Sequence, residues 1–150
     1  MEDYLCNMYS FLLDRTARRV KQYAQQQFNE KNFNITLDQW LVLRHLYEHN
    51  DLNQKELAEL LFKDTPTLTR IIDLLCEKGL TERKMHAKDR RSFIVHLTEA
   101  GLEMVKELMP PVSEIRLKAW EGLSEKDFQE FKRILNSIYN NLEDNKLGNI

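Results

Sequence analysis

Apolar residues recur every three or four positions over most of the chain, which is the spacing of helices with one buried face. Residues 4–31 contain no Gly or Pro and are expected to form one long helix. Further helices are expected over 37–49, 54–62, 66–78, 99–121 and from 125 onward. In the helix over 54–62, Leu57, Leu60 and Leu61 are predicted to face inward.

Residues that cap backbone N–H groups mark where these helices begin. Three pairs have the composition of helix N-caps: Thr36 with Gln39, Asn53 with Glu56, and Ser124 with Asp127. Thr65 is predicted as the N-cap of helix 66–78, because Pro66 suits a first helical position. Gly79 stands where a left-handed residue would end that helix.

The C-terminal third begins with a helix that contains two adjacent prolines. Thr98 is expected to cap helix 99–121. Pro110 and Pro111 are expected to kink or break it, because two backbone donors are lost. In the last helix an apolar stripe wants a helical partner, and its members are Phe128, Phe131, Leu135, Ile138 and Leu142.

Between helices 66–78 and 99–121 the spacing of apolar residues changes to two. Leu80–Met85 is expected to be a strand. In a second strand over 92–97, Phe93, Val95 and Leu97 alternate with Ile94 and His96. The polar segment 86–91 joins the strands into a hairpin, whose tip is expected to be exposed because its charges cannot be buried cheaply.

Composition limits the class of protein. The chain has 150 residues, the length of one domain, and only 4 Gly and 3 Pro, too few for an all-β fold. Cys6 and Cys76 make no disulfide framework, which favours a reducing compartment, the cytoplasm. No apolar run approaches the ~18 residues of a membrane span, and Glu2 and Asp3 argue against a signal peptide.

The net charge of −2 argues by itself against nucleic-acid binding. The distribution of charge matters more, because the C-terminal third is acidic and positive charge is concentrated within 80–97. The basic residues of that segment are Arg83, Lys84, Lys88, Arg90 and Arg91, against Glu82 and Asp89.

The order helix 54–62, tight turn, helix 66–78 and hairpin is that of a winged helix-turn-helix. A helix with short polar side chains on one face fits the major groove, which is ~12 Å wide. An arginine at a hairpin tip fits the narrower minor groove, whose negative potential attracts guanidinium.

The segment KDTPTLTRIIDLLCEKGL, followed by TERKMHAKDRRSFIVHLTEAG, resembles the MarR family of bacterial transcription regulators. The segment GLSEKDFQEFKRILNSIYNNL is similar to the family's C-terminal dimerisation helix. The resemblance covers about 30–142 and implies a mainly α single domain, 1–150, with a small β-hairpin wing. It further implies dimerisation helices over 1–34 and 99–147 and a DNA-binding region over 35–98.

The same resemblance implies a homodimer that binds a near-palindromic operator, usually as a repressor relieved by a small ligand or an oxidant. Thr67, Thr69 and Arg70 fall on the family's contact positions in the recognition helix. Thr65, with Asp64, lies at the start of that helix, where phosphate contacts are expected.

In the wing, Asp89 and Arg91 match the family's D-x-R pattern. The resemblance implies that Arg91 enters the minor groove and that Asp89 orients it. Arg90 is expected at a phosphate or the groove edge, and Lys88 belongs to the same basic loop.

Each of these assignments has a plainer alternative. The acidic and basic residues of the wing could form a surface salt bridge, and the polar face of helix 66–78 could simply face solvent. A protein-interaction adaptor of the same fold is the competing class, which the net charge mildly favours.

Candidates for effector binding are weaker. Tyr23, Phe28 and Trp40 could line a ligand cleft, although aromatic residues at helical spacing are more often core. Part of the family senses peroxide with a cysteine in its first helix, but Cys6 lies nearer the terminus than that position, so an inert interface residue is the alternative. Packing is the default role for Cys76.

Metal and enzyme chemistry find little support in the sequence. His45 and His49 are spaced to share a metal on one helix face, but no third ligand is apparent, so no metal site or cofactor is predicted. No Gly-rich phosphate loop, nucleophile elbow or HExxH motif is found, so an enzyme is not expected.

Overall fold

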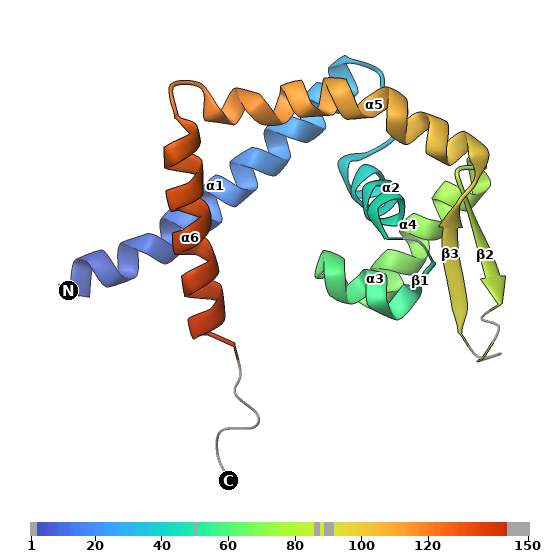
Figure 1. Cartoon of the computed structure of the whole chain (residues 1–150), viewed down its shortest axis with the longest axis horizontal. Helices are drawn as coiled ribbons and strands as arrows, with labels where there is room; N and C mark the ends of the chain where they lie inside the picture. The colour runs from blue at the N-terminus through green and yellow to red at the C-terminus, as the bar shows by residue number, and fades with distance from the viewer. Residues whose placement is uncertain (1–2, 50, 86–87, 89–91, 144–150) are drawn as a thin grey trace, which may run out of the picture. The chain divides into compact units, whose positions relative to one another are not determined.

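The fold is known from a computed structural model, which describes residues 3–49, 51–85, 88 and 92–143. The chain divides into two compact units, Met1–Ile115 and Arg116–Ile150. Its elements, labelled in Figure 1, are α1 (Asp3–Glu30), α2 (Leu37–Glu48), β1 (Leu52–Asn53), α3 (Gln54–Leu61), α4 (Thr65–Glu77), β2 (Thr81–Met85), β3 (Phe93–Leu97), α5 (Glu99–Leu117), the short 3-10 helix η1 (Lys118–Trp120) and α6 (Glu125–Asn141). The predicted mainly α fold with a hairpin is therefore confirmed.

The first unit has one core, to which α1 to α5 and the sheet contribute. Its largest fully buried side chains include Phe28, Leu43, Leu57, Leu68, Ile72, Leu75, Val95 and Val105. Of α1, only Ala24 and Phe28 are buried, so that helix joins the core at its C-terminal end. Leu57 faces inward as predicted, but Leu60 is 44% exposed and that prediction is wrong. Leu60 follows three residues after Leu57, and on this short helix the side that carries it reaches solvent.

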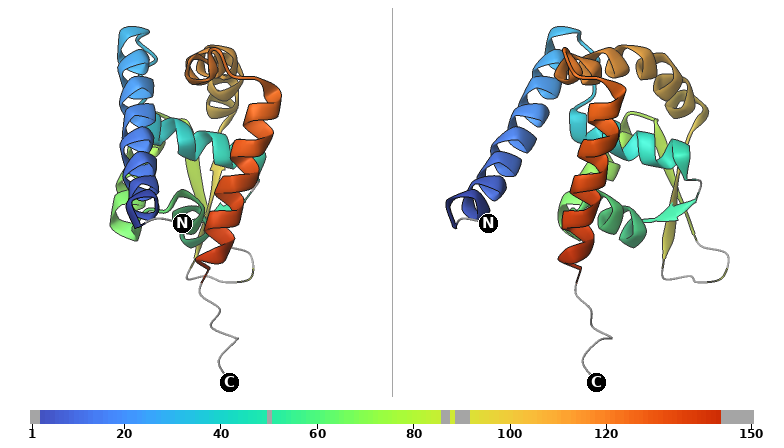
Figure 2. Two further views of the ribbon diagram at one scale, coloured as in Figure 1. Left: turned by 90° about the vertical axis from the view of Figure 1, so that its left-hand side faces the viewer. Right: turned by 60° about the vertical axis from the view of Figure 1, so that its left-hand side comes forward.

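The predicted hairpin is present, and it belongs to a larger sheet. β2 pairs antiparallel with β3, with Thr81 opposite Leu97 and Met85 opposite Phe93. β1, which the sequence pattern missed, pairs with the other edge of β3, so that the strand order is β1-β3-β2. The strands of the hairpin lie side by side in every view, next to the α3–α4 pair (Figures 1 and 2).

The helix caps follow the sequence with one exception. Capping boxes are formed at Thr36, Asn53 and Ser124, as predicted. The N-cap of α4, however, is Asp64, and Thr65 is the first residue of the helix. The prediction of Thr65 as cap is wrong because the Asp64 carboxylate, one residue earlier, accepts the hydrogen bond from the Thr67 amide.

The end of α4 and the start of α5 meet at Leu80. Gly79 adopts a left-handed φ of 74°, and the amides of Gly79 and Leu80 bond to the Cys76 and Leu75 carbonyls, which is a Schellman motif. Thr98 caps α5 as predicted, because its Oγ1 accepts a hydrogen bond from the Gly101 amide at 3.1 Å. A Cβ on Gly101 would lie 2.0 Å from the Leu80 carbonyl oxygen, so this close approach requires glycine.

The predicted break at Pro110 and Pro111 is wrong, because α5 continues through both residues. The two missing N–H groups deprive the carbonyls of Lys106 and Glu107 of helical partners. Both of those residues are exposed, so water can satisfy the carbonyls. The helix also ends at Leu117, short of the predicted 121, and is followed by η1.

The second unit consists mainly of α6. The ring of Trp120 packs edge-on against Phe128 and Phe131, with centroids 5.2 and 5.4 Å apart. No residue of α6 is buried, so its predicted apolar stripe is uncovered within a single chain. None of the helices in the described part of the chain combines the length and apolarity needed to cross a membrane.

Candidate nucleic-acid interface

One face of α4 is buried and the other is presented outward. Leu68, Ile71, Ile72 and Leu75 belong to the core. On the other side Thr65 and Arg70 are exposed, and Thr67 and Thr69 are half-buried. The predicted two-sided pattern is thus present, and the four predicted recognition residues lie on one described helix. Whether they contact DNA stays a prediction.

The first turn of α4 is organised by Asp64. Its carboxylate accepts hydrogen bonds from the Thr67 amide at 2.8 Å and from the Thr67 hydroxyl at 2.9 Å. These two bonds hold the pKa of Asp64 below its usual value of 3.8, with a smaller contribution from the charge of Arg70. The start of the helix therefore carries a fixed negative charge close to the predicted phosphate contacts.

A second arrangement of polar side chains joins α4 to the wing. Arg83 on β2 forms an ion pair with Asp73 on α4 at 2.6 Å and donates from Nε to Gln54 Oε1 on α3 at 2.8 Å. Gln54 Nε2 in turn donates to Thr69 Oγ1 at 3.2 Å. These contacts make Gln54, Asp73 and Arg83 part of the candidate site.

Sequence reasoning missed the role of these three residues. Asp73 was on the polar face of the helix and Arg83 was in the basic segment, but their pairing depends on the tertiary fold. A weak signal exists for Gln54, which directly follows the Asn53 cap and so lies at the start of α3.

Two lysines hold the ends of α4 against α2. Lys78 Nζ donates to the Asn34 carbonyl at 2.8 Å and to Gln39 Oε1 at 3.1 Å. Lys63, just before α4, pairs with Asp38 at 3.1 Å. Apolar burial and these polar contacts together fix the orientation of α4 on its scaffold, as groove recognition requires.

The predicted wing residues are described only in part. Lys88 is exposed, whereas Asp89, Arg90 and Arg91 lie outside the described residues. At the base of the hairpin His96 Nε2 lies 3.2 Å from Glu82 Oε2 on the paired strand.

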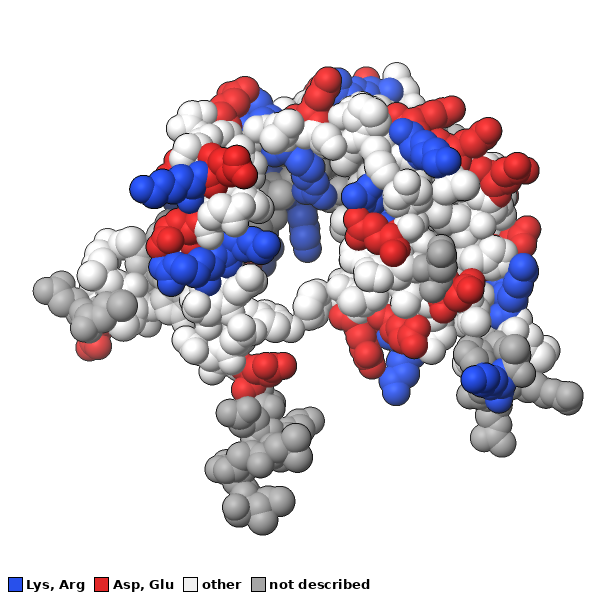
Figure 3. Space-filling model, in the orientation of Figure 1, with Lys and Arg blue, Asp and Glu red and all other residues white. Residues whose placement is uncertain are grey.

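The acidic surplus of the chain is not concentrated on α4. Glu99, Glu103, Glu107 and Glu114 are exposed along α5, and Figure 3 shows acidic side chains over that helix. On α4 itself, Asp73 is paired with Arg83. A net charge of −2 is therefore compatible with a DNA-binding face, because the charges are unevenly placed.

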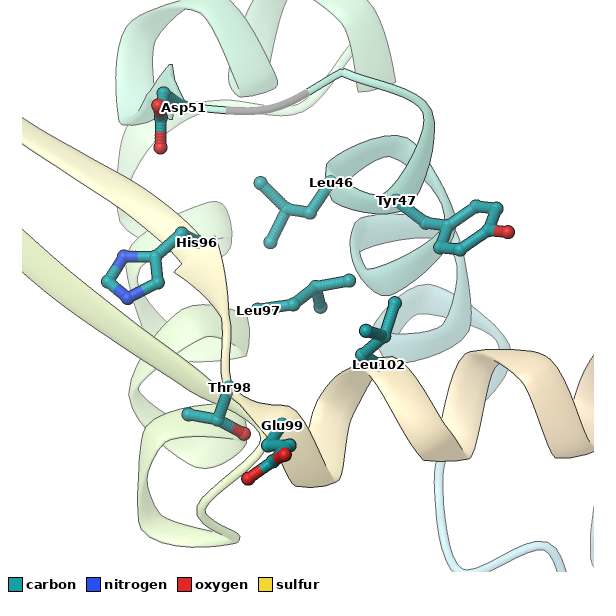
Figure 4. Close-up of a pocket in the computed structure, with 8 residues that line it drawn as sticks. All are labelled: Leu46, Tyr47, Asp51, His96, Leu97, Thr98, Glu99 and Leu102. Carbon is teal, nitrogen blue, oxygen red and sulfur yellow. The ribbon is translucent and has the colours of Figure 1, made fainter.

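The predicted ligand-cleft residues do not share one pocket. Phe28 and Trp40 are core residues, 1% and 4% exposed, and Tyr23 packs against that core. A pocket of about 390 Å³ lies instead between the end of α2, the end of β3 and the start of α5, with Leu46, Leu97 and Leu102 at its centre (Figure 4). Neither this pocket nor the one after α1, which Phe28 borders, is lined by Tyr23 or Trp40.

The remaining candidates are separate from this face of α4. Cys6 is exposed on α1, and Cys76 is half-buried with its sulfur 3.3 Å from Thr81 Oγ1. His45 Nδ1 lies 2.8 Å from the Leu41 carbonyl, and His49 is the C-cap of α2. The described residues hold no group of three or more His, Cys, Asp or Glu suited to a metal ion.

Comparison with known proteins places this arrangement in a family. The model of the MarR family matches residues 35–93. The organic hydroperoxide resistance transcriptional regulator of Bacillus subtilis (strain 168) is 34% identical over 143 residues, which are 95% of this chain and 90% of that protein. The chain therefore belongs to the MarR family of winged-helix transcriptional regulators.

Solved structures agree. The S. aureus MepR–DNA complex superposes with a TM-score of 0.78 at 29% identity, over 89% of this chain and 98% of that one. E. coli MarR complexed with operator DNA gives a TM-score of 0.74 at 26% identity, over 84% of this chain and 92% of that one.

Proposed function

We propose that this chain binds double-stranded DNA as a homodimer and represses transcription from a near-palindromic operator in the bacterial cytoplasm. In this proposal α4 enters the major groove, and Thr65, Thr67, Thr69 and Arg70 face the DNA. Lys88, Asp89, Arg90 and Arg91 form the wing, and Arg91 enters the minor groove. The two copies set the half-site spacing at ~10 bp or a small multiple.

The observation that carries the proposal is the two-sided character of α4. Leu68 and Ile72 on its inner face are 0% exposed, while its polar face has no large apolar residue apart from Leu74, at 42%. A helix held in this way cannot rotate to bury its polar face. The MepR and MarR structures that it resembles were solved with DNA bound, which supports the same use of this helix.

A small-molecule effector fits the same scheme. Such a ligand would relieve repression only by binding the DNA-incompetent state of the dimer more tightly than the competent one. Direct sensing by Cys6 is the alternative, and both mechanisms leave the DNA-binding face unchanged.

Substitution of two arginines tests the groove assignments. Fluorescence anisotropy with a labelled duplex from upstream of the chain's own gene should give, for Arg70→Ala and for Arg91→Ala, a loss of about 1–3 kcal/mol in binding free energy. Arg18→Ala, at an exposed arginine of α1 paired with Asp14, is the matched control and should bind like the parent chain. Light scattering should show dimers throughout. Unchanged affinity in both test variants would reject the assignments.

A further inference from the structure

The hydroxyl groups of Thr67 and Thr69 have opposite hydrogen-bond roles. Thr67 Oγ1 lies 2.9 Å from Asp64 Oδ2. The pKa of Asp64 is lowered, so the group is a carboxylate at neutral pH and can only accept. Thr67 must therefore donate its hydroxyl proton to Asp64, which leaves the oxygen lone pairs of Thr67 available to an outside donor.

Thr69 is set the other way by Gln54. The guanidinium of Arg83 has only donors, so the Gln54 atom 2.8 Å from its Nε is the amide oxygen. The amide nitrogen then faces Thr69 and donates to its Oγ1 at 3.2 Å. Within the described part of the chain nothing accepts the hydroxyl proton of Thr69. That proton is thus available to an outside acceptor.

We propose that this difference in polarity is a determinant of base preference, with Thr69 as a donor and Thr67 as an acceptor toward the major groove. Gln54 and Asp64 are then positioning residues, because they act on DNA only through the two threonines. The inference rests on the proposed function and deepens it. Asp73 supports the arrangement, since its ion pair holds Arg83 in place.

Base chemistry turns the polarity into a sequence preference. In the major groove guanine presents only acceptors, N7 and O6, whereas cytosine presents only its N4 amino donor. The base facing Thr69 should therefore be guanine rather than cytosine. The base facing Thr67 should be cytosine rather than guanine.

Selection from a randomised duplex library, followed by sequencing of the bound fraction, measures these preferences without a known operator. Thr69→Val and Thr67→Val remove one hydroxyl each at nearly constant shape, so each variant should lose preference at the position its threonine contacts. One net hydrogen bond corresponds to a loss of about three- to tenfold in the guanine-to-cytosine ratio there.

The decisive variant is Gln54→Glu. A carboxylate can only accept, so it would bind both Arg83 and the hydroxyl proton of Thr69, and the outward role of Thr69 would change from donor to acceptor. We expect the preference at the Thr69 position to invert from guanine to cytosine. The added negative charge weakens binding to all sequences alike and cancels in the ratio. Gln54→Met, which has similar length but no polar group, should lose the preference without inverting it.

Asp64→Asn is an independent second test at the other threonine. Asparagine keeps the helix N-cap, but its amide nitrogen can donate to Thr67 Oγ1 and free the Thr67 proton. The preference at the Thr67 position should invert from cytosine to guanine, while the Thr69 position stays unchanged.

The outcomes separate this inference from the proposed function. Inversion in either positioning variant, confined to the position identified by the matching valine variant, supports the inference. If the parent chain selects a sequence but Gln54→Glu and Asp64→Asn both retain its preferences, the inference is overturned and the proposed function stands. If the parent chain selects no sequence from the library, the proposed function fails and takes this inference with it.

Discussion

Arg83 Nη2 lies 2.6 Å from Asp73 Oδ1, and this contact joins the first strand of the wing to the recognition helix. The Arg83 side chain is only 25% exposed, while Asp73 is 53% exposed. A charged hydrogen bond that is partly shielded from water is stronger than one on the open surface. The pair is therefore placed to fix the orientation of the wing relative to α4.

A double-mutant cycle should detect this pair. We expect Arg83→Met and Asp73→Asn to show a coupling of about 1 kcal/mol in the free energy of unfolding, measured with urea. Arg18 and Asp14 on α1 form the matched control, because their side chains are 73% and 64% exposed. Their coupling should stay below about 0.5 kcal/mol. Equal couplings for the two pairs would contradict the structural role given to Arg83.

Arg83→Met should also weaken DNA binding by more than its effect on stability suggests. The variant would leave the wing and α4 folded but less firmly oriented, and a groove-binding surface is sensitive to such looseness. Anisotropy at a temperature far below the unfolding midpoint separates the two effects. A variant that binds DNA like the parent chain would show that the wing needs no such support.

Two glycines should respond differently to alanine. At Gly101 the new Cβ would lie 2.0 Å from the Leu80 carbonyl oxygen, so backbone must move, and the cost should reach about 2–3 kcal/mol. Gly79 has open space around it, and alanine there would meet only the strain of a left-handed φ, about 1 kcal/mol. Thermal unfolding of the two variants gives the ranking. A smaller loss for Gly101→Ala than for Gly79→Ala would be inconsistent with the close packing of α5 on Leu80.

Much of this fold could be predicted from the sequence because its signals are local. The capping boxes at Thr36, Asn53 and Ser124 and the left-handed Gly79 each depend on residues within one helical turn. The hairpin was predictable because alternation with a period of two is visible within five residues.

The features that were missed depend on partners distant in the sequence. β1 has only two residues, too few to form a pattern, and is a strand only because β3 lies beside it. α5 passes through Pro110 and Pro111 because buried Val105 and Val112, on either side of them, hold it in place. The contacts among Gln54, Asp73 and Arg83 join three elements and have no periodic signature.

The stabilising contribution of Asp64 should depend on pH in a defined window. Its folded-state pKa lies below 3.8, so the ionised form contributes stability that is present above that value and lost as pH falls through the folded pKa. In Asp64→Asn the cap remains but does not titrate. The difference between the parent chain and Asp64→Asn in urea midpoint should therefore be constant above pH ~5 and should change only below it. A difference that changes between pH 6 and 8 would point to another group.

The apolar stripe of α6 should be an interface between two copies of the chain. Phe131 is 45% exposed and Leu142 is 72% exposed in one chain, which is unfavourable for large apolar side chains that line up on one helix face. Ile138→Glu would place a charge in the stripe, and we expect it to weaken dimerisation by about tenfold or more, because an unpaired buried charge is costly. Asn140→Glu, on the opposite side of the same helix, is the matched control and should leave the dimer intact. Sedimentation at several concentrations measures both, and circular dichroism checks that the helices remain folded. If Ile138→Glu sediments as a dimer at every concentration at which the parent chain does, the copies associate through another surface.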